Sequence, residues 1–275
     1  MKILRTQLCI IAYNVSLRVM KMQETIYKLN TPVSICLLTD LHERDFSFLS
    51  NVRDHQPDII TVTGDVLHGY TTDENSLIAD RMIPFLSACV GIAPTFFSLG
   101  NHEWMIHPDD IEAITASGVT VLDNNWVDWN GLCIGGLTSA AVTEYRRFRT
   151  GSDHRYPEWD VRRSRLEELV EPSLPDLYWL NEFSSQPGFK ILLTHHPEYW
   201  SLIKDYDIDL ALAGHAHGGQ IRIFGQGLFA PGQGFLPKLT SGVHDGRLVI
   251  SRGLSNTAGI IPRLFNPREI VYVSK

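Results

Sequence analysis

Residues 33–42 read Val-Ser-Ile-Cys-Leu-Leu-Thr-Asp-Leu-His, an apolar run rich in β-formers that stops at two potential metal ligands. The apolar part, 33–39, predicts a buried strand. Alternate side chains of an extended segment point the same way, so Asp40 and His42 can both reach one ion. This strand-then-ligand pattern recurs along the chain.

Four further clusters of polar residues each follow a short apolar run, over 58–63, 94–99, 189–194 and 210–213. The clusters are Gly64-Asp65, Gly100-Asn101-His102-Glu103, His195-His196 and Gly214-His215-Ala216-His217. In open α/β sheets, ligands bind beyond the carboxyl ends of the strands. Five strands are therefore expected to deliver Asp, Asn and His to one edge.

The rest of the chain supplies further strands and helices. Periodicity predicts strands over 25–29, 119–122, 132–137, 219–224, 247–251 and 269–273. It predicts helices over 47–55, 74–90, 108–117 and 165–183, the last interrupted by Pro172 and Pro175. Residues 138–163 have no clear periodicity and are expected to be irregular. Alternating strands and helices followed mostly by strands predict an α/β protein with mixed sheets.

Composition indicates one ordinary globular domain. The chain has 275 residues, 44% hydrophobic and 20% charged, with no linker, repeat or low-complexity stretch. We expect a single domain over 25–275, preceded by an N-terminal helix or extension over 1–24. The net charge of −7 argues against a general nucleic-acid surface, although bound metal ions can still attract phosphorylated small molecules.

The N-terminal stretch has an amphipathic pattern. Leu4, Leu8, Ile11, Val15 and Val19 fall at helical spacing, with Lys2, Arg5, Arg18 and Lys21 mostly on other faces. A helix docked on the domain is the first interpretation, and weak contact of residues 1–21 with a membrane surface is the alternative. The four cysteines are scattered without a CxxC pair, which favours free thiols and a cytoplasmic location.

The ligand set indicates metal chemistry. Carboxylate, amide and imidazole without thiolate suit divalent manganese, iron or zinc. Two metal ions that share such ligands are a standard device for activating water against a phosphate ester.

The ordered series D-x-H, G-D, G-N-H-E, H and G-H-x-H resembles the calcineurin-like metallophosphoesterase superfamily from Thr25 to the C-terminus. Gly218-Gly219-Gln220, residues 251–254, Arg263 and residues 267–270 resemble a bacterial branch with the GHxHGGQ motif. The resemblance implies a four-layer α/β/β/α sandwich of two mixed sheets.

The same resemblance implies a role for each cluster. One metal ion would be held by Asp40, His42, Asp65 and His217, and the other by Asp65, Asn101, His195 and His215. Asp65 would bridge the two ions, whose shared hydroxide would attack phosphorus. His102 would be the catalytic acid, and Glu103 is expected to orient it rather than touch metal.

Three neighbouring residues are candidates for substrate or supporting contacts. His68 and Arg44 lie close enough in sequence to meet a phosphate. Either residue of the pair His195-His196 could be the ligand; His195 is chosen because it is nearer the strand end, which leaves His196 as a supporting or loop residue. A G-D-x-x-D-R-G motif is absent from the sequence, which disfavours a protein serine/threonine phosphatase.

The substrate is expected to be a phosphorylated small molecule or lipid, with a phosphodiester favoured over a phosphomonoester. A lipid-linked phosphate hydrolase and a nuclease of the same fold are alternatives within the enzymes. A non-catalytic interaction scaffold is the alternative outside them, and it would be expected to have lost some ligands.

Overall fold

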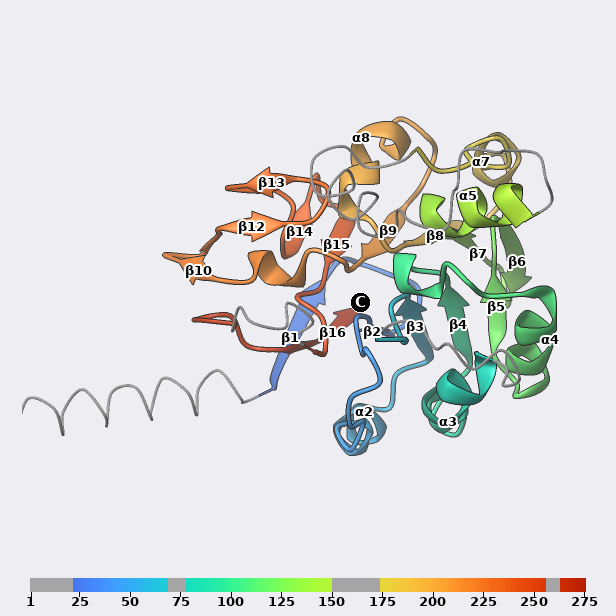
Figure 1. Ribbon diagram of the computed structural model, residues 1–275, viewed down its shortest axis with the longest axis horizontal. Helices are drawn as coiled ribbons and strands as arrows, with labels where there is room; N and C mark the ends of the chain where they lie inside the picture. The colour runs from blue at the N-terminus through green and yellow to red at the C-terminus, as the bar shows by residue number, and fades with distance from the viewer. Residues whose placement is uncertain (1–21, 69–77, 150–173, 256–262) are drawn as a thin grey trace, which may run out of the picture.

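The computed structural model describes residues 22–68, 78–149, 174–255 and 263–275, and two six-stranded mixed sheets dominate it (Figure 1). The first sheet has the order β1-β16-β2-β3-β4-β5, and only the β16–β2 pair is antiparallel. Its strands are β1 (Gln23–Lys28), β2 (Ile35–Leu38), β3 (Ile59–Thr63), β4 (Thr95–Ser98), β5 (Thr120–Leu122) and β16 (Glu269–Ser274).

The second sheet has the order β14-β15-β9-β8-β7-β6 and is antiparallel only at its two outer pairs. Its strands are β6 (Asn125–Trp129), β7 (Leu132–Leu137), β8 (Phe189–Thr194), β9 (Leu210–Ala213), β14 (Gly242–His244) and β15 (Leu248–Ile250). The central parallel strands of both sheets carry the runs that precede the polar clusters.

Three apolar cores hold the layers together, as β2 illustrates. Ile35 and Leu37 point into the core between the sheets, together with Ile191 and Leu212 of the second sheet. Cys36 and Leu38 alternate with them and enter the core under the helices. A strand covered on both faces must be apolar throughout, which explains the unbroken run at 35–38.

Helices cover the outer faces of both sheets. The first sheet is covered by α2 (Leu49–His55), α3 (Ala79–Val90) and α4 (Pro108–Ala116), and the second by α7 (Leu180–Ser184) and α8 (Trp200–Ile203). The predicted four-layer α/β/β/α sandwich of mixed sheets is confirmed. The predicted helix over 108–117 is also confirmed, since α4 begins at Pro108 and ends one residue earlier.

Two sequence predictions are wrong in detail. Residues 138–163 are not irregular throughout, because α5 (Ala140–Arg149) occupies their first part. The helix expected over 165–183 is confined, among the described residues, to α7, and residues 174–179 before it are not helical. The rest of that range lies outside the described residues.

The sequence analysis missed β6 and, nearer the C-terminus, β14 and the short strands β11 (Gln226–Gly227), β12 (Phe229–Ala230) and β13 (Gly234–Phe235). β6 pairs with β7 through the two-residue turn Asn130-Gly131, both with positive φ. Asn-Gly between two apolar runs is a strong hairpin signal, and it was available in the sequence.

Small hairpins extend from the second sheet. β10 (Arg222–Ile223) pairs with β11, and β12 pairs with β13. The strand expected over 219–224 is therefore shorter than predicted. Cys36, Cys89 and Cys133 are free and buried.

The predictions for residues 1–21 lie outside the described residues. None of the helices in the described ranges combines the length and the apolar character needed to cross a membrane.

Candidate metal centre

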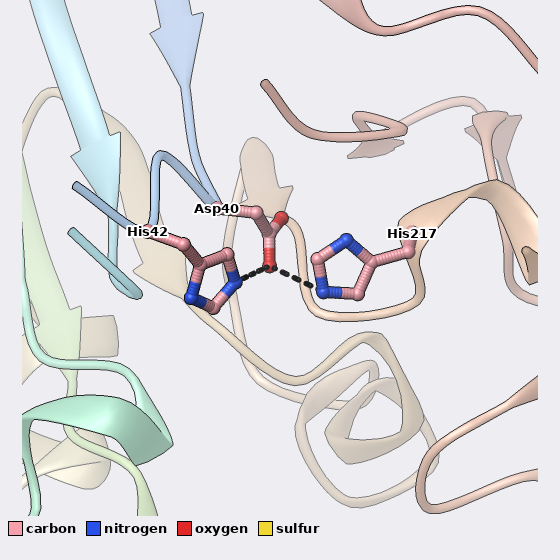
Figure 2. Close-up of side chains that lie close together, drawn as sticks. All are labelled: Asp40, His42 and His217. Atoms are coloured by element: carbon pink, nitrogen blue, oxygen red, sulfur yellow. Dashed lines mark ion pairs between the residues drawn. The ribbon is translucent and has the colours of Figure 1, made fainter. Parts of the chain in front are cut away.

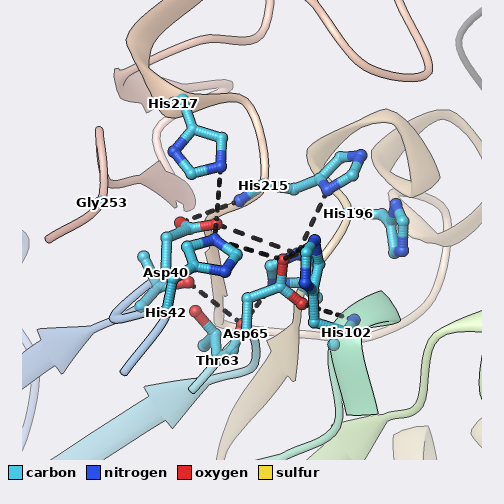
Figure 3. A network of polar contacts seen from close by, with 12 residues as sticks. Asp40, His42, Thr63, Asp65, His102, His196, His215, His217 and Gly253 are labelled. Atoms are coloured by element: carbon cyan, nitrogen blue, oxygen red, sulfur yellow. Dashed lines mark hydrogen bonds and ion pairs between the residues drawn. The ribbon is translucent and has the colours of Figure 1, made fainter. Parts of the chain in front are cut away.

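The five polar clusters meet at one place, where strands of both sheets end (Figure 3). Asp40 and His42 follow β2, Asp65 follows β3, and the short helix η1 (Asn101–Glu103) follows β4. From the second sheet, His195 follows β8, while His215 and His217 follow β9, the latter opening the short helix η3 (His217–Gly219).

Sharp backbone turns direct these side chains inward. Asp40, His42, Asp65, His215 and His217 all have φ between 45° and 64°. This left-handed region is uncommon for residues other than glycine, and each such residue costs roughly 1–3 kcal/mol. Such unfavourable backbone conformations persist mainly at functional sites, so five of them in one cluster indicate a functional site.

Two glycines allow the segments to approach closely. A Cβ on Gly100 would lie 2.3 Å from Oδ1 of Asp65. A Cβ on Gly214 would lie 2.0 Å from Oγ1 of Thr39 and 2.7 Å from Oδ2 of Asp40. The glycines of the G-N-H and G-H-x-H motifs are therefore required by the space beside the carboxylates.

The first group of possible ligands is Asp40, His42 and His217 (Figure 2). Oδ1 of Asp40 lies 3.9 Å from Nε2 of His42 and 3.5 Å from Nε2 of His217. All three ligand atoms lie within 4.8 Å of one another. The other ring nitrogen of His42, Nδ1, donates to the carbonyl of Leu67 at 2.8 Å, which leaves Nε2 for a ligand.

The second group is Asp65, His195 and His215. Oδ2 of Asp65 lies 3.1 Å from Nε2 of His195, and Nε2 of His195 lies 3.2 Å from Nδ1 of His215. Nδ1 of His195 donates to the carbonyl of Thr63 at 2.7 Å.

Asp65 lies between the two groups. The same oxygen, Oδ2, is 3.7 Å from Nε2 of His42, so the carboxylate faces both sets of imidazoles. One carboxylate between two sets of imidazoles is the arrangement that a pair of cations would share.

Unsatisfied buried atoms test whether metal ions fit here. Within the described ranges, Oδ1 of Asp40, Nε2 of His42 and Oδ1 of Asn101 are buried without a hydrogen-bond partner. Buried polar atoms are ordinarily paired, and an orphaned acceptor is costly. All three are metal-ligand atoms, so the donor set fits divalent cations.

The pKa values of two histidines also favour bound cations. Burial alone would lower the pKa of His195, but the charge of Asp65, its hydrogen bond and the charge of Asp40 raise that pKa to about 10. The negative pocket therefore favours a positive charge at Nε2, and a metal ion could replace that proton. Burial lowers the pKa of His42 well below 6.5, which keeps this ring neutral and able to ligate.

His102 stands beside the two groups and is more accessible than they are. Nε2 of its ring is 3.8 Å from Oδ2 of Asp65, and Nδ1 lies 3.1 Å from the carbonyl of His68. Its backbone N–H donates to Oδ1 of Asp65 at 2.9 Å. The ring is thus held at the edge of the site with Nε2 directed toward the centre.

Glu103 has a different role from the one expected. It does not orient the ring of His102. Its buried carboxylate accepts hydrogen bonds from four backbone N–H groups, those of Asp65, Val66, Leu67 and Gly100, at 2.8–3.2 Å. Burial and the nearby charge of Asp65 raise its pKa to about 7. Glu103 positions the turn that carries Asp65.

Of the other candidates, His68 lies near the centre and Arg44 is exposed. The ring centroid of His68 lies 6.0 Å from that of His42. Arg44 is fully on the surface, and the only interaction of its side chain that the structure describes is electrostatic, with His68.

His196 points away from the two groups. Its Nε2 lies 2.8 Å from Oγ of Ser139, and its Nδ1 lies 3.0 Å from Oε1 of Glu198. Glu198 was missed by the sequence analysis. Its only signal was its position two residues after His196 in a segment without ligand spacing.

Comparison with known proteins identifies the family of this chain. The family model for calcineurin-like phosphoesterases matches residues 33–219. The chain belongs to this family, a class of metal-dependent phosphoester hydrolases, and family membership implies a dinuclear centre of divalent metal ions. The predicted family is thereby confirmed.

Two of the relatives similar to this chain are bacterial, and a more distant solved structure is not. The chain is similar to the protein YpbG of Bacillus subtilis, with 30% identity over 82% of this chain and 74% of that protein. It is similar to the phosphodiesterase YaeI of Escherichia coli, with 27% identity over 70% of this chain and 63% of that protein. A solved dimetal phosphatase from Danio rerio covers 80% of this chain and is itself covered to 87%, with 12% identity and a TM-score of 0.43.

Proposed function

We propose that this protein hydrolyses phosphodiesters at a two-metal centre bridged by Asp65. Asp40, His42 and His217 complete one metal site, and Asn101, His195 and His215 complete the other. The position of Asp65 carries the proposal, since one of its oxygens lies within 3.8 Å of His42, His102 and His195.

Manganese, iron or zinc suits this set of oxygen and nitrogen donors. When bound, two such ions would polarise the phosphate and lower the pKa of a coordinated water. The protein's own contribution is to hold the ligands in place. The carbonyls of Leu67 and Thr63 fix the rings of His42 and His195, and Glu103 fixes the turn at Asp65.

His102 supplies the proton for the leaving group in this proposal. When its ring is doubly protonated, Nδ1–H stays on the carbonyl of His68 and Nε2–H points into the site. The proton at Nε2 passes to the leaving oxygen as its bond to phosphorus breaks.

The preference for a diester rests on one relative, YaeI, which is named a phosphodiesterase. The net charge of −7 speaks against the nuclease alternative. The scaffold alternative would predict missing ligands, whereas all seven proposed ligand residues and His102 are present.

Two measurements test the proposal. Metal analysis of the purified protein should find two ions per chain, and matched aryl diesters should be cleaved faster than monoesters under manganese, iron or zinc. Two bound ions without hydrolysis of either ester would favour the scaffold.

The variant His102→Ala tests the role of the acid. It should keep both ions and lose about 10²–10⁴-fold in turnover. The loss should be smaller for esters with acidic leaving groups, which need no proton. His244→Ala, a substitution of a histidine in β14, is the matched control. Loss of both metals in His102→Ala would refute the assignment.

A further inference from the structure

Five large apolar side chains stand exposed on the two small hairpins and on the segment beside them, next to the metal centre. Of the nine large hydrophobic residues that are exposed in the described ranges, these five fall within two short segments. We call them the hairpin patch: Ile223, Phe224, Phe235, Leu236 and Phe265. Phe224 is fully exposed, Phe235 is 85% exposed, and Leu236 and Phe265 are each 65% exposed.

Hydrogen bonds between the two hairpins join these residues into one surface. The amide of Gln226, which pairs with Ile223, donates to the carbonyl of Pro237 at 2.8 Å, next to Leu236. The N–H of Leu236 donates to the carbonyl of Leu228 at 2.9 Å, which ties the second hairpin to the first.

Phe235 and Phe265 are held at the two ends of the patch by a ring contact and a hydrogen bond. The rings of Phe229 and Phe235 lie 5.4 Å apart across the second hairpin. The N–H of Arg222 donates to the carbonyl of Leu264 at 3.0 Å, which brings Phe265 beside the first hairpin. In Figure 1, β10 and β13 project together on one side of the molecule.

The backbone conformation at three of these positions disfavours large apolar residues, so the stability of the fold does not account for their presence. Phe224, Leu236 and Phe265 have φ of 48°, 52° and 54°. Glycine or asparagine adopts this left-handed region far more readily than a bulky apolar residue does. Each of the three positions therefore combines local strain with the exposure of apolar surface, two costs that a bound partner would offset.

The charge around the patch indicates what kind of partner it would bind. Residues 219–240 and 263–268 contain four basic and no acidic residues in a chain of net charge −7, and all of the four but the buried Arg263 are at least partly exposed. Lys238 is exposed beside Leu236. Apolar side chains on projecting turns with basic neighbours match the boundary between anionic headgroups and acyl chains.

The described chain begins beside the segment that carries Phe265, because the N–H of Gln23 donates to the carbonyl of Arg268 at 2.8 Å. Residues 1–21, outside the described residues, contain four basic and no acidic residues.

We infer that the hairpin patch docks the protein on an anionic lipid bilayer. Phe224, Phe235, Leu236 and Phe265 enter the interface, and the exposed Lys238 and the partly exposed Arg222 and Arg268 contact the headgroups. The patch continues from η3, which carries His217, and the amide of Asn266, next to Phe265, donates to the carbonyl of His217 at 2.7 Å. Docking would therefore hold the metal centre close to the membrane surface.

The experiment is sedimentation of the full-length protein with vesicles of phosphatidylglycerol and phosphatidylethanolamine, or of phosphatidylcholine alone. It requires no hydrolysis, so its outcome is independent of the proposed function. Binding is expected on the anionic vesicles and should weaken at high salt. The variants are Phe224→Asn, Leu236→Asn and Phe265→Asn, with Tyr178→Asn before α7 as a control of 91% exposure.

Each of the three variants should weaken vesicle binding about tenfold or more, while the control should not. Because asparagine tolerates positive φ, their melting temperatures should be unchanged or raised. Unaltered binding in the three variants would overturn the inference. Two other outcomes would also overturn it. In the first, the parent protein is a dimer and the variants are monomers, which would make the patch a protein interface. In the second, vesicle binding is lost only when Lys2, Arg5, Arg18 and Lys21 are all changed to Glu.

Discussion

Oε1 of Glu198 lies 3.7 Å from Nε2 of His215, on the side of the ring opposite to the metal centre. The other nitrogen of that ring, Nδ1, faces Nε2 of His195 at 3.2 Å. The carboxylate also accepts the Nδ1–H of His196 at 3.0 Å. Glu198 and His196 therefore support His215 from behind, and a carboxylate behind a ligating histidine fixes its tautomer and strengthens its donor nitrogen.

We expect Glu198→Ala to weaken the binding of one of the two metal ions about 10–100-fold. The ion proposed for Asp40, His42 and His217 should bind as before, since the ion pairs of Glu198 are with His196 and His215, on the side of the second group. Calorimetric titration with manganese or zinc would resolve the two sites. Glu182→Ala on the exposed face of α7 is the control. Two unchanged affinities would contradict a supporting role for Glu198.

Gly100→Ala tests the packing of η1 against Asp65. The added Cβ would lie 2.3 Å from Oδ1 and 2.6 Å from the backbone nitrogen of Asp65, so Asp65 must move. Because the φ of Gly100 is −86°, the substitution adds no backbone strain, and the effect is steric. Metal content and hydrolysis should both fall strongly. Gly91→Ala, whose Cβ would meet no atom nearer than 3.5 Å, should leave both unchanged.

Glu103→Gln tests whether the buried carboxylate holds the turn at Asp65. A glutamine has one acceptor oxygen, so its NH₂ group would face two of the four N–H donors. We expect the free energy of unfolding to fall by about 2–4 kcal/mol in a urea titration. The matched variant Glu112→Gln, exposed on α4, should change it by less than about 0.5 kcal/mol. Equal stabilities for the two variants would show that Glu103 is not a structural clamp.

Much of the fold was predictable because the strands before each cluster are buried on both faces. Unbroken apolar runs such as 35–38 can be read directly from a sequence. The edge strand β6 was missed because it is short and partly exposed, so its apolar residues are diluted by Asn125 and Asp128. α5 was missed because five of its seven side chains over 140–146, where burial is described, are partly exposed and give little periodicity.

The supporting residues of the site were harder to predict than the candidate ligands. The ligand residues recur in motifs, whereas the roles of Glu103 and Glu198 depend on contacts between distant segments. Glu103 binds the backbone 36–38 residues away, and Glu198 reaches His215 from a different loop. The hairpin patch was equally hidden, since only the fold reveals that Phe224 and Phe265 are exposed neighbours.

The pH dependence of stability can be tested outside the metal centre, at Asp58. Its carboxylate accepts hydrogen bonds from the backbone N–H and the hydroxyl of Ser34, at 2.7 and 2.9 Å, and ties the starts of β2 and β3. These two hydrogen bonds hold the pKa of Asp58 below 3.8. A depressed folded-state pKa stabilises the fold above the unfolded-state pKa and ceases to do so as the pH falls through the folded-state pKa.

Asp58→Asn should therefore be less stable than the parent at pH 7, by no more than about 1 kcal/mol for this exposed group. The difference should shrink below pH 4 and vanish once Asp58 is protonated in the folded parent. Urea titrations of both proteins at pH 7, 4 and 3 would measure it, with Asp54→Asn on α2 as the control. A difference that stayed constant over this range would mean that the charge of Asp58 contributes nothing, and that only the shape of the side chain matters at the start of β3.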